Sequence, residues 1–297
     1  MSQAIEAAPP VTGPIQADWE LDYYSRPILE PDGKKRWELL ICSSPRDGAA
    51  FRWCLNCPAG SVNSSWLRQA LEQALAAATE QGFAPPRRLR CWRGSMRTMV
   101  QRAAEPLSLE VVPSRRCYAL VEWLQERMAT IYPNEEGFMA GPLAPPPLPI
   151  QPLAVPLPEA ARGDRWSWAS LPLGTLREAA DWEVSFAGLV PLSTELDDDV
   201  RVSGLRLFSA SRSLAIAGWL AGLEPVRLEV DGNQLVLEAG MEDRWLLGNL
   251  ESEEAAAAAA FRSARSQAAG IQFIAVQSSE DQPGFDGFWI LRDLPDA

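Results

Sequence analysis

The sequence predicts an α/β (α+β) protein of two domains. Its 297 residues exceed the usual size of one domain, and a proline-rich connector at 136–163 separates two halves in which strand patterns are mixed with helical ones. We therefore expect an N-terminal domain at 18–135 and a C-terminal domain at 164–297. The small, aperiodic residues of 1–17 predict a disordered tail.

The first half is expected to begin with a β-hairpin. Large apolar residues alternate with polar ones over 18–29 and 35–43, and Pro31-Asp32-Gly33 supplies turn chemistry between them. A third strand is expected at 49–57. Alternation places Glu20, Asp22 and Tyr24 on one side of the first strand, which together with Arg26 and Glu38 predicts a ladder of charged pairs.

Helices and strands then alternate. A helix is expected over 63–81, with Asn63 or Ser64 as its N-cap and Gly82 as its stop. The further elements expected are a strand at 87–92, a helix at 95–104 capped by Ser95, a strand at 108–112 and a helix at 114–130. The resulting order, βββαβαβα, is that of ribonuclease-H-like folds, in which parallel βαβ units extend an antiparallel meander.

The second half predicts a mixed α/β domain. The stretch from Gly141 to Pro158 is expected to be an extended, semi-rigid connector. Asp231-Gly232-Asn233 predicts a tight hairpin. The expected elements are helices at 172–183, 210–222 and 251–268, and strands at 203–209, 224–230, 233–240, 243–249, 271–277 and 286–292.

The amino-acid composition limits the kinds of catalytic and metal site that this chain can form. The chain has no histidine, which excludes Ser-His and Cys-His catalysis. Its five cysteines are an odd number confined to the first half, which indicates free thiols in a reducing compartment. Cys54 and Cys57 have metal-pair or redox spacing, but a zinc site needs two more ligands, so we expect buried or strand cysteines, no metal and no cofactor. No apolar run is long enough for membrane insertion, and no signal peptide is recognised.

Charge is divided unequally between the halves. The net charge is −12, yet residues 1–158 contain as many basic as acidic side chains, so the acidic excess belongs to the second half. We expect this acidic half to serve as a protein-docking or regulatory surface, because acid-rich surfaces repel phosphate. Lys34 and Lys35 are the only lysines among 27 basic residues, and arginine suits planar contacts with bases and bidentate contacts with phosphate.

A candidate nucleic-acid interface lies in the first half. Arg88, Arg90 and Trp92 share one face of the expected strand and could be presented outward, while Leu89, Cys91 and Arg93 share the other. Interleaved arginines and aromatics suit phosphate contact and base stacking. The predicted RNA-binding residues are Arg88, Arg90, Trp92, Arg93, Arg97, Arg115, Arg116, Lys34 and Lys35. The alternative is a solvated basic surface or internal pairing with Glu105, Glu110, Glu122 and Glu126.

A metal-dependent nuclease is the rival interpretation. Asp22 and Glu72 could hold cations as in ribonuclease-H-type enzymes, but the strand at 87–93 offers no acid, so the constellation is incomplete. The run Asp197-Asp198-Asp199 indicates a solvated loop. No catalytic residues are predicted.

The amino-acid sequences of several short segments resemble those of one protein family. Trp19-Glu20-Leu21-Asp22-Tyr23-Tyr24-Ser25-Arg26-Pro27-Ile28 and Gly33-Lys34-Lys35-Arg36-Trp37-Glu38-Leu39 resemble the opening of the Tab2/Atab2 translation activators of cyanobacteria and chloroplasts. Further similar segments are Val62-Asn63-Ser64, Arg90-Cys91-Trp92-Arg93, Pro113-Ser114-Arg115-Arg116 and Gly287-Phe288-Trp289-Ile290-Leu291-Arg292. Members in algae and plants bind RNA and promote translation of photosystem reaction-centre messages, notably that of a photosystem I core subunit.

The resemblance implies a non-catalytic protein that binds single-stranded RNA, here an mRNA leader and not DNA, and that promotes photosystem biogenesis. It implies thylakoid-associated or ribosomal protein partners. The lack of a signal peptide and of a membrane-spanning run predicts a cytoplasmic protein, which would then lie peripheral to thylakoids. The absence of a transit peptide fits a cyanobacterial member. Two alternatives remain: a photosystem assembly scaffold without RNA contact, and a diverged metal-dependent nuclease.

Overall fold

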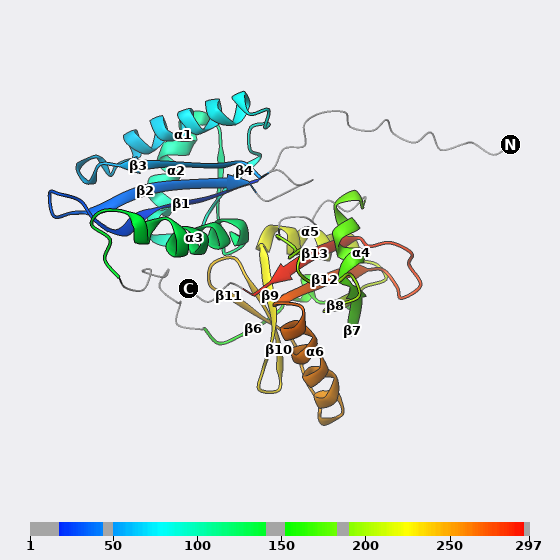
Figure 1. Cartoon of the computed structure of the whole chain (residues 1–297). Coiled ribbons are helices and arrows are strands. Elements are labelled where there is room, and N and C mark those ends of the chain that lie inside the picture. Colours follow the sequence, from blue (N-terminus) through cyan, green and yellow to red (C-terminus); the bar gives the residue numbers. More distant parts are fainter. Residues whose placement is uncertain (1–17, 44–49, 141–151, 183–189, 294–297) are drawn as a thin grey trace.

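A computed structural model describes residues 18–43, 50–140, 152–182 and 190–293. The expected tail at 1–17 and residues 141–151 of the proline-rich connector lie outside the described residues. Two α/β parts follow one another along the chain and lie against each other (Figure 1). Within the described residues, no helix combines the length and hydropathy needed to cross a bilayer.

The N-terminal part is built on one five-stranded sheet. Its strands are β1 (Trp19–Leu29), β2 (Lys35–Ser43), β3 (Arg52–Cys57), β4 (Arg88–Cys91) and β5 (Glu110–Pro113), in the order β3-β2-β1-β4-β5. The first three strands are antiparallel, and β4 and β5 extend the sheet in parallel from β1. This confirms the predicted order of elements and the meander extended by βαβ units.

Helices cover both faces of this sheet. Helices α1 (Ser64–Glu80) and α2 (Arg97–Ala104) lie on one face and α3 (Tyr118–Thr130) on the other (Figure 1). Because side chains alternate along a strand, Trp19, Leu21 and Tyr23 pack toward α1 and α2, whereas Leu40 and Cys42 pack toward α3. The even-numbered residues of β1 therefore lie beneath α3.

Of the predicted helix starts, that of α1 is confirmed, whereas those of α2 and α3 differ from the structure. Asn63 caps α1 as expected, since its side-chain oxygen accepts a hydrogen bond from the Trp66 amide at 2.9 Å. The predicted Ser95 cap is wrong: a 3₁₀ turn at Gly94–Met96 precedes α2, and no side chain caps that helix. Helix α3 begins later than predicted because the backbone amides of Ser114 and Arg115 bond to the carbonyls of Cys91 and Gly240.

The C-terminal part contains two four-stranded sheets. One has the order β6-β11-β10-β9, formed by β6 (Val155–Pro156), β11 (Asp243–Asn249), β10 (Gln234–Ala239) and β9 (Pro225–Asp231). The other has the order β13-β12-β8-β7, formed by β13 (Gly287–Arg292), β12 (Ile271–Gln277), β8 (Arg201–Phe208) and β7 (Arg165–Pro172). Helices α4 (Leu173–Arg177), α5 (Ser213–Leu223) and α6 (Ala255–Gln267) complete this part.

Most predicted elements of the second half are confirmed, including the hairpin, where Asp231 pairs with Gln234 around Gly232 at φ +60°. Strand β7 was missed, and the helix predicted at 172–183 shrinks to α4 and a 3₁₀ turn at Glu178–Asp181. The tryptophans of β7 mark it as a strand in retrospect. Trp166 and Trp168 pack on one face of the sheet, while Ala169 and Leu171 pack on the other.

A glycine in β8 allows close packing of the second sheet. A Cβ added to Gly204 would lie 2.4 Å from the Phe273 carbonyl oxygen and 2.5 Å from its ring. We expect Gly204→Ala to lower the free energy of unfolding by about 1–3 kcal/mol, as overpacked cores do.

The matched control is Gly218→Ala in α5, where an added Cβ meets nothing within 4 Å. Because alanine favours helix over glycine, this change should raise stability by about 0.5–1 kcal/mol. Urea unfolding followed by tryptophan fluorescence compares the two. Equal midpoints for both variants would contradict the close approach at Gly204.

Candidate nucleic-acid interface at the domain junction

The central arginine of the predicted interface is buried between the two domains. Arg90 of β4 is 2 % exposed. Its Nε and Nη2 donate to the two carboxylate oxygens of Glu224 at 2.6 and 3.0 Å, and its Nη1 pairs with Asp18. All three guanidinium nitrogens therefore have carboxylate partners. The arrangement is the bidentate geometry that makes arginine–carboxylate pairs strong.

Glu224 is the C-terminal domain's half of this contact. It directly follows α5 and adopts a left-handed conformation, φ +55°. Besides Arg90, the carboxylate accepts hydrogen bonds from Ser114 Oγ at 2.9 Å and Arg88 Nη1 at 3.3 Å. Burial alone would raise its pKa, but the hydrogen bond and charge of Arg90, with Arg116 and Ser114, outweigh it and lower the pKa of Glu224 to about 2. The carboxylate is ionised at neutral pH.

Two further predicted residues also cross the junction. Arg115 donates through Nη1 to Glu238 at 2.9 Å and through Nε to the Gly240 carbonyl at 3.1 Å. Arg116, 2 % exposed, donates to the carbonyls of Pro225 and Ile290. These arginines satisfy backbone and carboxylate acceptors of the C-terminal domain, and their donors face protein and not solvent.

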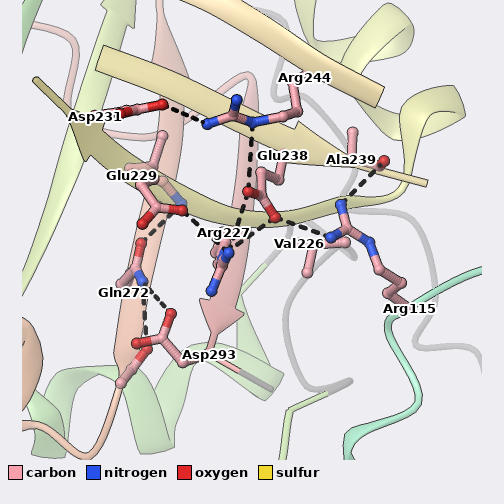
Figure 2. A network of polar contacts seen from close by, with 12 residues as sticks. Arg115, Val226, Arg227, Glu229, Asp231, Glu238, Ala239, Arg244, Gln272 and Asp293 are labelled. Atoms are coloured by element: carbon pink, nitrogen blue, oxygen red, sulfur yellow. Dashed lines mark hydrogen bonds and ion pairs between the residues drawn. The ribbon is translucent and has the colours of Figure 1, made fainter. Parts of the chain in front are cut away.

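Glu238 joins the junction to a network inside the C-terminal domain (Figure 2). Its carboxylate is shared by Arg115, Arg227 at 3.0 Å and Arg244 at 3.6 Å, and Arg244 also binds Asp231. Burial would raise the pKa of Glu238, but Arg227 and then Arg115 more than compensate and lower it. The acids of this region are thus neutralised by arginine. Among the described residues, no group of three potential metal ligands is found.

Arg93 and Trp92 are buried on the α3 side of the first sheet. Arg93, 3 % exposed, donates to Asp22 at 2.6 Å, and its guanidinium lies 4.0 Å from the Tyr24 ring centroid. Trp92 packs against α3 in the core. Two expectations are therefore wrong. The face bearing Arg90 and Trp92 is covered by α3 and the C-terminal domain, and Arg93 turns away from the Leu89 face because β4 ends at Cys91.

The predicted charge ladder lies in this same buried layer. Asp22 binds both Arg93 and Arg26, the latter at 2.8 Å, and Arg26 continues to Glu38 at 2.9 Å. Burial opposes ionisation of Asp22, but Arg26 and Arg93 prevail and lower its pKa. Glu20 accepts the amide of Leu120 near the start of α3 at 2.7 Å, where the helix dipole favours negative charge.

The carboxylates considered for a nuclease do not meet. Asp22 faces α3, whereas Glu72 belongs to α1 on the opposite face of the sheet and lies 3.8 Å from Arg68. The two cysteines of the Cys54/Cys57 pair are also separated. Cys57 accepts a hydrogen bond from Tyr23 at 3.0 Å in the core, while Cys54 is exposed and lies 3.9 Å from Arg127.

The remaining predicted residues are accessible. Lys34 and Lys35 lie exposed where the β1–β2 turn enters β2. Arg97 is exposed at the first position of α2, and within the described residues no hydrogen bond or ion pair holds its side chain. The Arg88 side chain is 21 % exposed and forms ion pairs with Glu224 and Asp18. Sequence reasoning missed Asp18 and Glu224, for which no local pattern signals a partner so distant in the chain.

Comparisons with known proteins match both parts of the chain. The family model described as "RNA-binding protein Tab2/Atab2 N terminal" matches residues 18–127, and that described as "RNA-binding protein Tab2/Atab2, C-terminal domain" matches residues 145–292. A protein of Zea mays named "Protein TAB2 homolog, chloroplastic" is 36 % identical over 94 % of this chain and 72 % of its own length. One of the same name from Arabidopsis thaliana is 33 % identical over 94 % of this chain and 75 % of its own. No solved structure matches the chain.

The junction predicts an acid-dependent loss of stability. The pKa of Glu224 is lowered to about 2 in the folded protein from an ordinary value of 4.5. Its contribution, about 3 kcal/mol, is fully present above the ordinary value and is lost as pH falls from there toward the folded value. Glu224→Gln should lower the free energy of unfolding by about 3 kcal/mol at neutral pH, because Arg90 loses a buried counter-charge.

In this variant the stability should also fall less steeply below about pH 4.5 than in the unchanged protein. Urea unfolding at a series of pH values measures both effects. Glu136→Gln, at an exposed acid just beyond the N-terminal domain, is the control and should leave the profile unchanged. Parallel pH profiles for Glu224→Gln and the unchanged protein would refute the role assigned to Glu224.

Proposed function

The chain belongs to the Tab2/Atab2 family of RNA-binding proteins, and from this premise we propose that it binds single-stranded RNA to promote synthesis of photosystem reaction-centre subunits. The observation that carries the proposal is the match of RNA-binding family models to both domains. The chloroplast relatives support a role in photosynthetic cells. The RNA would be an mRNA leader.

Accessibility selects the residues that would contact RNA. Phosphate binding requires cations that can exchange their counterions for the nucleic acid. Of the predicted residues, Lys34, Lys35 and Arg97 are exposed and Arg88 is partly so. We assign the RNA contacts to these four. Arg90, Arg93, Arg115 and Arg116 instead hold the protein together, and buried Trp92 offers no free face for stacking.

The chemistry of the acids favours binding over catalysis. Asp22, the best candidate metal ligand of a nuclease, has an arginine on each carboxylate oxygen. A cation would have to displace both guanidinium groups to bind there. A non-catalytic role is therefore the simpler account of these residues.

The acidic half would face a protein partner. The acidic excess of the chain lies beyond residue 158, and its field disfavours contact with phosphate. The RNA backbone would then lie over the N-terminal domain, leaving most of the C-terminal surface for thylakoid-associated or ribosomal proteins. We propose for it a cytoplasmic location at the periphery of thylakoids, where such partners would be met.

Replacing Lys34 and Lys35 together by alanine tests the RNA contact. The double variant should bind single-stranded leader RNA more weakly, and the slope of log K against log salt should fall by roughly 1.4, because each lost phosphate contact on a single strand removes about 0.7. Fluorescence anisotropy across a salt series measures both quantities. Arg262→Ala, at an exposed position of α6 in the acidic domain, should leave the slope unchanged.

An unchanged slope in the lysine variant would remove these residues from the interface. Failure of the unchanged protein to bind RNA would favour the assembly scaffold, as would co-purification with thylakoid proteins that survives RNase treatment. Arg90→Ala is a poor probe of RNA contact, since it breaks a buried ion pair between domains and would weaken binding by destabilising the fold.

A further inference from the structure

A cavity of about 610 Å³ opens at the junction of the two domains. The N-terminal domain contributes Gly94, Arg97 and Pro113 to its wall, and the C-terminal domain contributes Leu223 and the segment 240–243. Its volume lies within the range of small-ligand sites, which occur preferentially between domains. We call it the junction pocket.

Three charged side chains of the junction pocket have no hydrogen-bond or ion-pair partner among the described residues. Arg97 lines one wall, and Glu242 and Asp243 line the other. All three are exposed, and no hydrogen bond or ion pair holds them anywhere in 18–43, 50–140, 152–182 or 190–293. They differ in this from the neighbouring Arg90 and Arg115, whose donors are occupied by Glu224 and Glu238. As far as the described part of the chain goes, the pocket therefore presents one unpaired cation and two unpaired anions to a ligand.

The wall that bears the acids is held in place by the junction itself. The Gly240 carbonyl accepts from the backbone amide of Arg115 at 3.4 Å and from its Nε at 3.1 Å, and the Gly240 amide donates to the Glu224 carbonyl at 3.0 Å. Gly240 has φ +52°, which disfavours other residues at this position. Its backbone is thus anchored on both sides, so Glu242 and Asp243 start from a fixed point.

The pocket also has an apolar element. The terminal methyl of Met241 lies 3.8 Å from the position that a Cβ on Gly94 would occupy, so Met241 approaches the opposite domain at a residue without a side chain. Methionine packs well against flat aromatic surfaces because its thioether is flexible and polarisable. A planar ring entering the pocket would meet this side chain.

We propose that the junction pocket receives one unpaired base of the bound RNA and selects guanine. Ionised carboxylates only accept hydrogen bonds, and guanine presents two adjacent donors on its Watson–Crick edge, the N1–H and the N2 amino group. Adenine and cytosine place an acceptor beside their amino donor, and uracil flanks its single N–H with two carbonyls. Glu242 and Asp243 would accept from guanine, Met241 would pack on the base and Arg97 would pair with its phosphate.

This inference rests on the proposed RNA binding and names the base that the same protein prefers. Single-stranded RNAs are recognised through unstacked bases whose edges and faces are free. A pocket built from both domains would make recognition depend on the junction held by Arg90 and Glu224. The acids would thereby contribute sequence preference, while the exposed basic residues contribute affinity.

The test uses single-stranded RNAs of equal length that differ at one position, which carries guanine, inosine or adenine. Inosine keeps the N1–H but lacks the N2 amino group. The full-length protein should bind the guanine RNA about tenfold more tightly than the adenine RNA, the discrimination expected of one good base contact, with inosine between them. The double variant Glu242→Gln/Asp243→Asn should lose this preference, whereas the control Glu136→Gln should keep it.

A second pair of variants tests the phosphate contact. Arg97→Ala should weaken binding of all three RNAs and lower the salt slope by about 0.7, while Arg102→Ala, an exposed arginine on the same helix outside the pocket, should change neither. RNA binding without guanine preference, or a preference kept by the double variant, would overturn the junction pocket and leave the proposed function standing. No RNA binding by the unchanged protein would overturn both.

Discussion

The ion pair between Arg90 and Glu224 is the interaction on which the arrangement of the two domains depends. Each residue comes from a different domain and each is almost fully buried. Removing two charges from water costs several kcal/mol per ion, and only close geometry with every donor and acceptor satisfied offsets that cost. Here Arg90 uses all three guanidinium nitrogens and Glu224 also receives Ser114. Other orientations of the domains would strand these charges, so the pair selects one orientation.

This constraint explains how the arginines are divided between structure and function. A planar guanidinium can satisfy two carboxylates or carbonyls at once and stays charged when buried. Arg90, Arg115 and Arg116 exploit this at the junction, and Arg26 and Arg93 do so beneath α3. The two lysines, which are more strongly hydrated, both lie on the exposed turn into β2. Proximity of basic residues in the sequence is therefore a poor guide to which of them are exposed to a ligand.

The acidic excess of the second half also has a structural use. Glu224 and Glu238 neutralise arginines of the N-terminal domain, so part of that charge lies inside the protein and not on its surface. Glu242 and Asp243, close to the anchored Gly240, are acids whose side chains have no partner within the residues that the structure describes. The buried acids of the junction thus help to hold the segment 240–243 in place, and the exposed acids of that segment are available to a ligand.

The sequence by itself determined the elements whose causes are local. Alternation defined β1 and β2, Asn63 capped α1, and Gly232 closed the hairpin of β9 and β10. These features depend on neighbours a few residues away, and the order βββαβαβα followed from them. The resemblance to the family likewise followed from the residues of a few short segments.

Only the tertiary structure decided which polar residues are buried. Arg90 meets Glu224 across 134 residues, a separation at which no periodicity links the two. An exposed strand would have the same pattern of arginines. The sequence therefore could not predict that α3 and the C-terminal domain cover β4. Strand β7 was missed for a related reason: its two tryptophans share one face of a sheet whose partner strand, β8, begins beyond residue 200. Burial is set by what packs on a strand, and that is decided by contacts the local sequence does not contain.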